Sequence, residues 1–159
     1  MDTPSKLADR LQVEGAKVVT FFSKYADEDW EVDVYTENDI WDLRNVLAHL
    51  VTSEQGFLRL FESVRNGGDG VPEDFSIDRY NAGQQDRMKG LSPEVLIGEF
   101  LETRSETCRW VAAQSASELE KEGRHPFLGT VSLREMIKMV IVHNQIHLRD
   151  IRKTFEKHP

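Results

Sequence analysis

The sequence has a single cysteine and no long hydrophobic run. Cys108 is the only cysteine among 159 residues, so no disulfide can form within the chain. This suits a reducing compartment, and we expect a cytoplasmic protein. The first residues lack the basic segment and the apolar segment of a secretory signal peptide. The apolar runs are much shorter than a bilayer-spanning helix, so no membrane association is expected.

Positive charge is also scarce. Lysine and arginine number 20 against 28 aspartates and glutamates, which gives a formal net charge of −8. No local cluster of basic residues offsets this balance. A phosphate backbone would be repelled by such a surface, so nucleic acid is not expected as a partner.

Four segments place apolar residues at spacings of three and four, which indicates amphipathic helices. They cover about residues 4–27, 40–65, 93–122 and 133–155. The expected caps, whose side-chain oxygens accept from free backbone N–H groups, are Thr3, Asn38 or Asp39, Ser92 and Ser132.

The connections between these segments contain little predicted strand. Residues 30–39 alternate apolar and polar side chains and predict one short extended piece. The longest connection, residues 66–91, has room for a short helix between Ser76 and Gly90. Residues 123–132 predict a turn-rich linker. We therefore expect one all-α domain over residues 1–159, a four-helix bundle whose long second connection permits a crossover.

Two of the five histidines lie on one face of the last predicted helix. His143 and His147 are four residues apart, so their rings project about 40° apart and about 6 Å apart along the axis. The same row holds Met136, Val140 and Ile151, so it faces the core. The two rings are either core histidines with hydrogen-bond partners or ligands of one metal ion.

His49, midway along the second helix, can complete such a site. If the second and fourth helices touch, a third imidazole stands opposite the pair. Three histidines leave open coordination positions, as catalytic metal sites do. His125 precedes a proline and is expected at the surface or in a turn, with approach to a site as the alternative. His158 is expected to be poorly ordered near the terminus.

Two other metal-site patterns are disfavoured. Zincin proteases need glutamate directly after the first histidine, where this chain has Asn144. Di-iron bundles need glutamate three residues before a histidine, and Val46, Val140 and Asn144 occupy those positions. No catalytic acid or base can be named from the sequence.

Several polar and aromatic residues near the histidines have two readings. Asp150 either orients a histidine ligand or forms a surface ion pair with Lys153 or Arg149. Asn45 and Ser53 stand one turn on either side of His49 and could point to the site.

Trp41 either forms a wall of the site or packs in the core, and Tyr80 and Asn81 either line an entrance or anchor the long connection. Glu54 is about 140° from His49 around the helix and is not expected to be a ligand. Cys108 is expected to be a small core residue.

The fourth helix carries apolar residues beyond one stripe. Those outside the histidine row are Ile137, Met139, Ile141, Val142, Ile146 and Leu148. A helix that is apolar on most sides is buried on most sides, so we expect a homodimer packed through this helix.

Four stretches in order resemble one known family: WDLRNVLAHLVTSE, FSIDRYNAG, HPFLGTVSLREM and HNQIHLRDI. Together they are similar to the DinB superfamily, near the N-terminal domain of the mycothiol-dependent maleylpyruvate isomerases. The resemblance implies a bundle with up-down-down-up connectivity and the metal ligands His49, His143 and His147. It also implies a zinc or nickel ion, and homodimers are common in the family.

The resemblance further implies chemistry on a small molecule, with a low-molecular-weight thiol as a possible cosubstrate. The chain departs from some members in having Leu148, Arg149 and Asp150 where they carry His-Arg-Gly-Gln after the last histidine. It is also expected to lack the isomerases' C-terminal domain. Three hypotheses follow: a metal-dependent transferase or hydrolase, a non-catalytic metal or small-ligand binding protein of the stress response, and an interaction module without metal.

Overall fold

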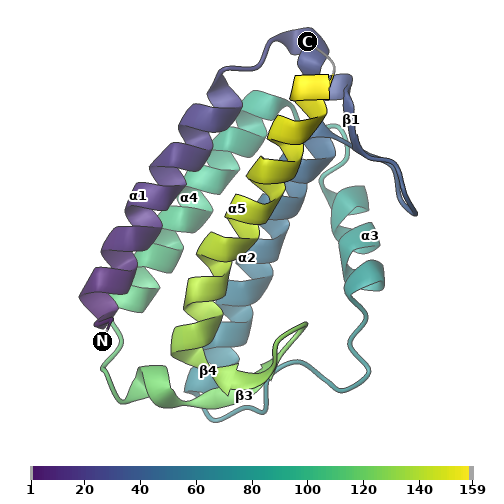
Figure 1. Cartoon of the computed structure of the whole chain (residues 1–159). Coiled ribbons are helices and arrows are strands. Elements are labelled where there is room, and N and C mark those ends of the chain that lie inside the picture. Colours follow the sequence, from purple (N-terminus) through teal and green to yellow (C-terminus); the bar gives the residue numbers. More distant parts are fainter. Residues whose placement is uncertain (1, 158–159) are drawn as a thin grey trace.

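Four long helices dominate the computed structural model, which describes residues 2–157. They are α1 (Pro4–Ser23), α2 (Leu43–Arg65), α4 (Pro93–Ala112) and α5 (Leu133–Lys157), shown in Figure 1. The all-α four-helix bundle expected from the sequence is confirmed. His158, which was expected to be poorly ordered, lies outside the described residues.

Each of the four long helices packs against two others. Figure 1 shows α1 beside α4 and α2 beside α5, and α2 also contacts α4. The long connection carries the short helix α3 (Ile77–Arg87) back along α2. As a result, α2 and α4 both begin at the end of the bundle where α1 ends.

Three of the four expected caps are confirmed. The backbone N–H groups of Lys6, Val95 and Glu135 donate to the hydroxyls of Thr3, Ser92 and Ser132, each at 3.2 Å. Such caps satisfy N–H groups that have no partner inside the helix, so local sequence alone is enough to place them.

The expected cap of α2 at Asn38 or Asp39 is wrong. Asp42 caps this helix, because its carboxylate accepts from the N–H of Asn45 at 2.8 Å, and Asn45 accepts from the N–H of Asp42 at 2.9 Å. The strands β1 (Asp33–Tyr35) and β2 (Trp41–Asp42) pair antiparallel and keep the preceding residues extended. Because β1 and β2 pair, the helix begins only at Leu43.

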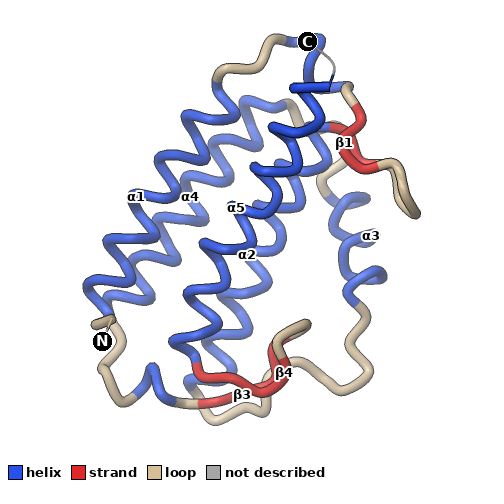
Figure 2. The backbone as a smooth tube through the Cα atoms, in the orientation of Figure 1, coloured by secondary structure: helices blue, strands red, loops and turns tan. Residues whose placement is uncertain are grey.

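Two helices end earlier than expected, and one linker is more regular. α1 ends at Ser23 and α4 at Ala112, followed by the 3₁₀ turns η1 (Asp27–Glu31) and η2 (Glu118–Glu120). The expected turn-rich linker is a hairpin of β3 (Glu122–His125) and β4 (Gly129–Ser132), red in Figure 2. Gly129 adopts φ 77° at its turn, which glycine allows without strain.

Much of the apolar surface of α5 is covered within one chain. Ile137, Ile141 and Leu148 are 0%, 2% and 6% exposed, and Val142 is 43% exposed. The single bundle therefore accounts for most of the apolar pattern that led to the expectation of a dimer. Among residues 2–157, no helix is both long and apolar enough to span a bilayer.

Candidate functional site

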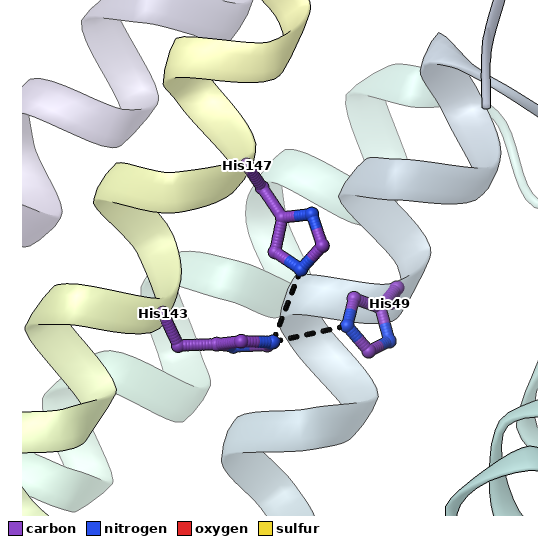
Figure 3. A group of neighbouring side chains, drawn as sticks. All are labelled: His49, His143 and His147. Atoms are coloured by element: carbon purple, nitrogen blue, oxygen red, sulfur yellow. Dashed lines mark hydrogen bonds between the residues drawn. The ribbon is translucent and has the colours of Figure 1, made fainter.

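Three histidine rings meet between α2 and α5. His49 comes from α2, and His143 and His147 come from successive turns of α5 (Figure 3). His143 Nε2 lies 3.1 Å from His49 Nε2 and 3.1 Å from His147 Nε2. The nitrogens that these rings offer all lie within 4.8 Å of one another. The contact between the second and fourth long helices thus brings together the residues that the sequence singled out.

A hydrogen-bond chain fixes the proton on His147. The Tyr35 hydroxyl donates to Asp150 Oδ2 at 2.7 Å and lies 2.7 Å from His147 Nδ1. Because the hydroxyl has one proton and the carboxylate needs it, His147 Nδ1–H donates to the Tyr35 oxygen. The lone pair of His147 therefore lies on Nε2 and points at the other two rings.

Neutral imidazoles alone cannot satisfy both short contacts of His143. Its Nε2 either carries a proton, which serves one neighbour, or a lone pair, which faces the lone pair of His147. A metal ion accepts all three lone pairs at once. Nitrogens bound at about 2.1 Å to one ion would lie about 3.0 to 3.4 Å apart, and the two 3.1 Å contacts of His143 match this spacing. The donor set fits a divalent ion.

Burial keeps the three rings neutral. It lowers the pKa of His143 to about 3 and that of His147 to about 4. Burial, with the adjacent rings of His143 and His147, holds the pKa of His49 well below its usual value of 6.5. Only the neutral ring has a lone pair for a metal, so the burial that disfavours protonation favours ion binding.

The structure decides between the alternatives that were predicted for three residues near His49. Ser53 Oγ lies 3.2 Å from His49 Nδ1, so Ser53 points to the site. Trp41 packs against the core, as one of its two readings predicted, and its ring centre also lies 4.8 Å from that of His49. Asn45 is turned away, because its side chain caps α2 and donates to Gln85 at 2.9 Å.

Asp150 takes both roles that the sequence allowed. Asp150 accepts a hydrogen bond from the Tyr35 hydroxyl and so acts on His147 through that side chain. It also lies 3.3 Å from the guanidinium of Arg149. Tyr35 itself was missed, since it stands on a short strand 112 residues before His147. Its only sequence signal is an aromatic residue on the polar face of an alternating segment.

Glu54 lies away from the three rings, inside the core. Its carboxylate forms a salt bridge with the Arg104 guanidinium at 2.5 Å, and both side chains are at most 5% exposed. Arg104 also donates to Asn144 at 2.6 Å and to the carbonyl of Leu11 at 2.9 Å. This buried network joins all four long helices. Cys108 is half-buried against the core, and burial raises the pKa of its thiol.

One cavity of about 400 Å³ opens onto the histidines. His49, Ser53 and His143 lie at one end, and aromatic and aliphatic side chains form most of the wall. Tyr80 and Asn81 line it, as one of their two readings predicted. Tyr80 also anchors the connection, because its hydroxyl donates to the carbonyl of Thr52 at 3.0 Å.

The expected surface position of His125 is wrong, although the residue does directly precede the turn of the hairpin. It ends β3 and is 2% exposed, with its ring stacked on Phe57 at 5.4 Å between centres. The N–H groups of Phe127 and Leu128 both donate to Nδ1 at 3.3 Å, so the proton stays on Nε2. Burial lowers the pKa of His125 to about 4. The hairpin folds onto α2, which local sequence does not reveal.

Comparisons with known proteins agree with this architecture. A family model described as the DinB superfamily matches residues 5–151. A search of curated proteins finds no match. Among solved structures, the chain is similar to YfiT from Bacillus subtilis, reported as "a probable metal-dependent hydrolase with an unusual four-helix bundle topology". That pair has a TM-score of 0.77 and 15% identity, covering 98% of this chain and 87% of YfiT.

Two further structures show the same fold at low identity. The mycothiol-dependent maleylpyruvate isomerase matches with a TM-score of 0.76 and 13% identity, covering 93% of this chain and 60% of the isomerase. The colibactin self-resistance protein ClbS, solved with double-stranded DNA, matches with a TM-score of 0.73 and 12% identity, over 97% and 96% of the two chains. Since the family model spans most of the sequence, the chain belongs to the DinB superfamily.

Proposed function

We propose that this protein is a metal-dependent enzyme acting on a small molecule, with His49, His143 and His147 as ligands of a divalent ion. The observation that carries the proposal is the meeting of three neutral imidazoles at the end of an apolar cavity. Three protein ligands leave positions open for water or substrate, as catalytic sites require. The description of YfiT as a probable metal-dependent hydrolase supports the same class of chemistry.

The side chains of this protein have separable roles in that proposal. A bound ion supplies Lewis acidity and lowers the pKa of a water or thiol ligand. Tyr35 and Asp150 hold the proton of His147 on Nδ1 and orient its ring. Ser53 lies beside the ring of His49 and orients it. Phe57 lines the cavity and limits access of water to the open positions.

The proposal includes zinc or nickel as the ion and either hydrolysis or transfer from a low-molecular-weight thiol as the reaction. Imidazole nitrogens suit both metals. The likeness to a mycothiol-dependent isomerase supports a thiol cosubstrate, and the likeness to YfiT supports hydrolysis. The cytoplasmic location and the absence of a nucleic-acid partner stay predictions. ClbS was solved with DNA, which makes a DNA-binding assay a useful control.

Elemental analysis of protein purified without a histidine tag tests the metal site. We expect about one zinc or nickel per chain after reconstitution. The His143→Ala variant removes the central ligand and should lose this binding, while its helical circular dichroism stays unchanged. A wild-type protein that takes up neither metal would refute the site.

Activity assays separate catalysis from simple binding. The metal-loaded protein is offered low-molecular-weight thiols with electrophilic acceptors, and simple esters and amides. We expect turnover that disappears with a chelator and returns with metal. Metal binding without turnover across both panels would favour the non-catalytic binding protein instead.

We also propose a homodimer that packs through α5. Val142 stays 43% exposed on this helix and offers an apolar contact. Sedimentation equilibrium should give twice the mass of the chain at micromolar concentration, and Val142→Glu should shift the population to monomer. A wild-type monomer at that concentration would contradict the proposal.

A further inference from the structure

The cavity beside the histidines is elongated along one face of α2. Its floor consists of residues that recur at helical spacing, namely His49, Ser53, Gly56, Phe57, Leu60 and Ser63. From the first to the last of these residues the helix rises by about 21 Å. The cavity therefore suits a long, narrow molecule better than a compact one.

The walls of this cavity are apolar, and one glycine sets its width. Phe57 and Phe127 meet at 6.4 Å between ring centres, and Phe75 and Tyr80 meet at 5.8 Å. A Cβ atom at Gly56 would lie 2.6 Å from the Tyr80 hydroxyl, so only glycine lets this ring approach α2 so closely. Aromatic walls of this kind bind the hydrocarbon part of a ligand.

The charge of the lining is opposite to that of the chain. The protein has a net charge of −8, but none of the lining residues is aspartate or glutamate. Arg59 is the one lysine or arginine among them. Its Nη2 donates to the Tyr80 hydroxyl at 3.2 Å, and among residues 2–157 no carboxylate lies within 4.0 Å of its guanidinium. Several other arginines, including Arg104, pair with carboxylates.

We propose that this cavity binds a long monocarboxylate with an apolar body, and that Arg59 binds the carboxylate away from the histidines. Arg59 follows His49 by ten residues, about 15 Å along the helix. The guanidinium has five N–H donors and uses one on Tyr80, so others are available for an anion. The apolar walls then direct the opposite end of the ligand to the three rings. The inference that the ligand reacts at the end beside the histidines rests on the proposed function. The contact between its carboxylate and Arg59 requires no metal.

The test uses 6-phenylhexanoate and its neutral amide, 6-phenylhexanamide, with metal-stripped protein in isothermal titration calorimetry. Arg59 is exposed, so its ion pair with the carboxylate predicts about fivefold tighter binding of the acid than of the amide. Arg59→Gln should reduce this ratio to about twofold or less and leave amide binding unchanged. Arg79→Gln is the matched control, because Arg79 is an exposed arginine on α3 outside the cavity lining and should keep the full ratio.

Three outcomes overturn the inference: neither ligand binds, acid and amide bind equally to the wild type, or the preference survives Arg59→Gln. A zinc titration of the same preparation keeps the two proposals apart. An acid preference that depends on Arg59, in a protein that takes up no metal, supports the ligand class and refutes the metal site. Metal uptake without an acid preference refutes the ligand class alone.

Discussion

Replacing Tyr35 by phenylalanine removes the one oxygen atom that joins His147 to Asp150. In the wild type this oxygen lies 2.7 Å from His147 Nδ1 and 2.7 Å from Asp150 Oδ2. The variant leaves the ring of His147 in place without an acceptor for its Nδ1–H. The ring can then move its proton to Nε2, the atom that must bind the metal. We expect weaker metal binding with little change in the fold.

The size of the effect follows from the hydrogen bonds that are lost. Partners that orient a metal-ligating histidine typically contribute about 10-fold to 100-fold in metal affinity. This corresponds to about 1.4 to 2.8 kcal/mol. The lower end applies if a water molecule takes the place of the Tyr35 oxygen, because the site is half-buried. Asp150→Asn keeps an oxygen acceptor and should cause a smaller loss.

Competition for zinc against a chromophoric chelator measures this affinity with metal-stripped protein at neutral pH. Tyr25→Phe is the matched control, because Tyr25 is also half-buried and packs on Phe155 at 4.7 Å between ring centres, away from the three histidines. The control should bind zinc as the wild type does. If Tyr35→Phe binds zinc within about twofold of the wild type, Tyr35 does not orient His147 for metal binding.

Three further predictions concern the scaffold. Arg104→Met should lower the free energy of unfolding by about 3–5 kcal/mol, because it leaves Glu54 buried without its partner. Adding Glu54→Gln to this variant should recover part of the loss, as measured by urea unfolding. Gly15→Ala should destabilise by about 1–3 kcal/mol because its Cβ would lie 2.8 Å from Arg104 Cγ, whereas Gly98→Ala, which meets open space, should stabilise by about 0.5–1 kcal/mol. The pKa of His125 is lowered to about 4, below its usual value of 6.5, so unfolding takes up a proton between these values. Its contribution to stability is therefore full above pH 6.5 and is lost as the pH falls towards 4. In the metal-free protein, His125→Asn should reduce the slope of unfolding free energy against pH by about 1.4 kcal/mol per unit, and an unchanged slope would contradict this.

Helix starts show where local sequence was sufficient. Thr3, Ser92 and Ser132 cap their helices through contacts three residues away, so the pattern carries the whole interaction. The start of α2 differs, because Asp42 belongs to a strand pair with β1 before it caps the helix. Pairing between segments decided that boundary, and single-sequence patterns do not encode it.

The residues of the candidate site also fall into two groups, those that the sequence indicated and those that only the structure identified. His143 and His147 share a helix face by spacing, and the third ring follows if α2 and α5 touch. Tyr35 and Arg59 gave no comparable signal, because their partners come from other elements. The position of His125 was predicted from the proline beside it, whereas packing of the hairpin on Phe57 decides its burial.

By itself the sequence determined the helical bundle, most of its caps, and the pair His143 and His147 on one apolar helix face. Periodicity and capping are properties of residues three and four apart, so they can be read along the chain. Only the tertiary structure decided the proton position on His147, the buried pair of Glu54 and Arg104, and the cationic, apolar cavity beside the rings. These depend on distances between elements far apart in sequence, which are fixed when the helices pack.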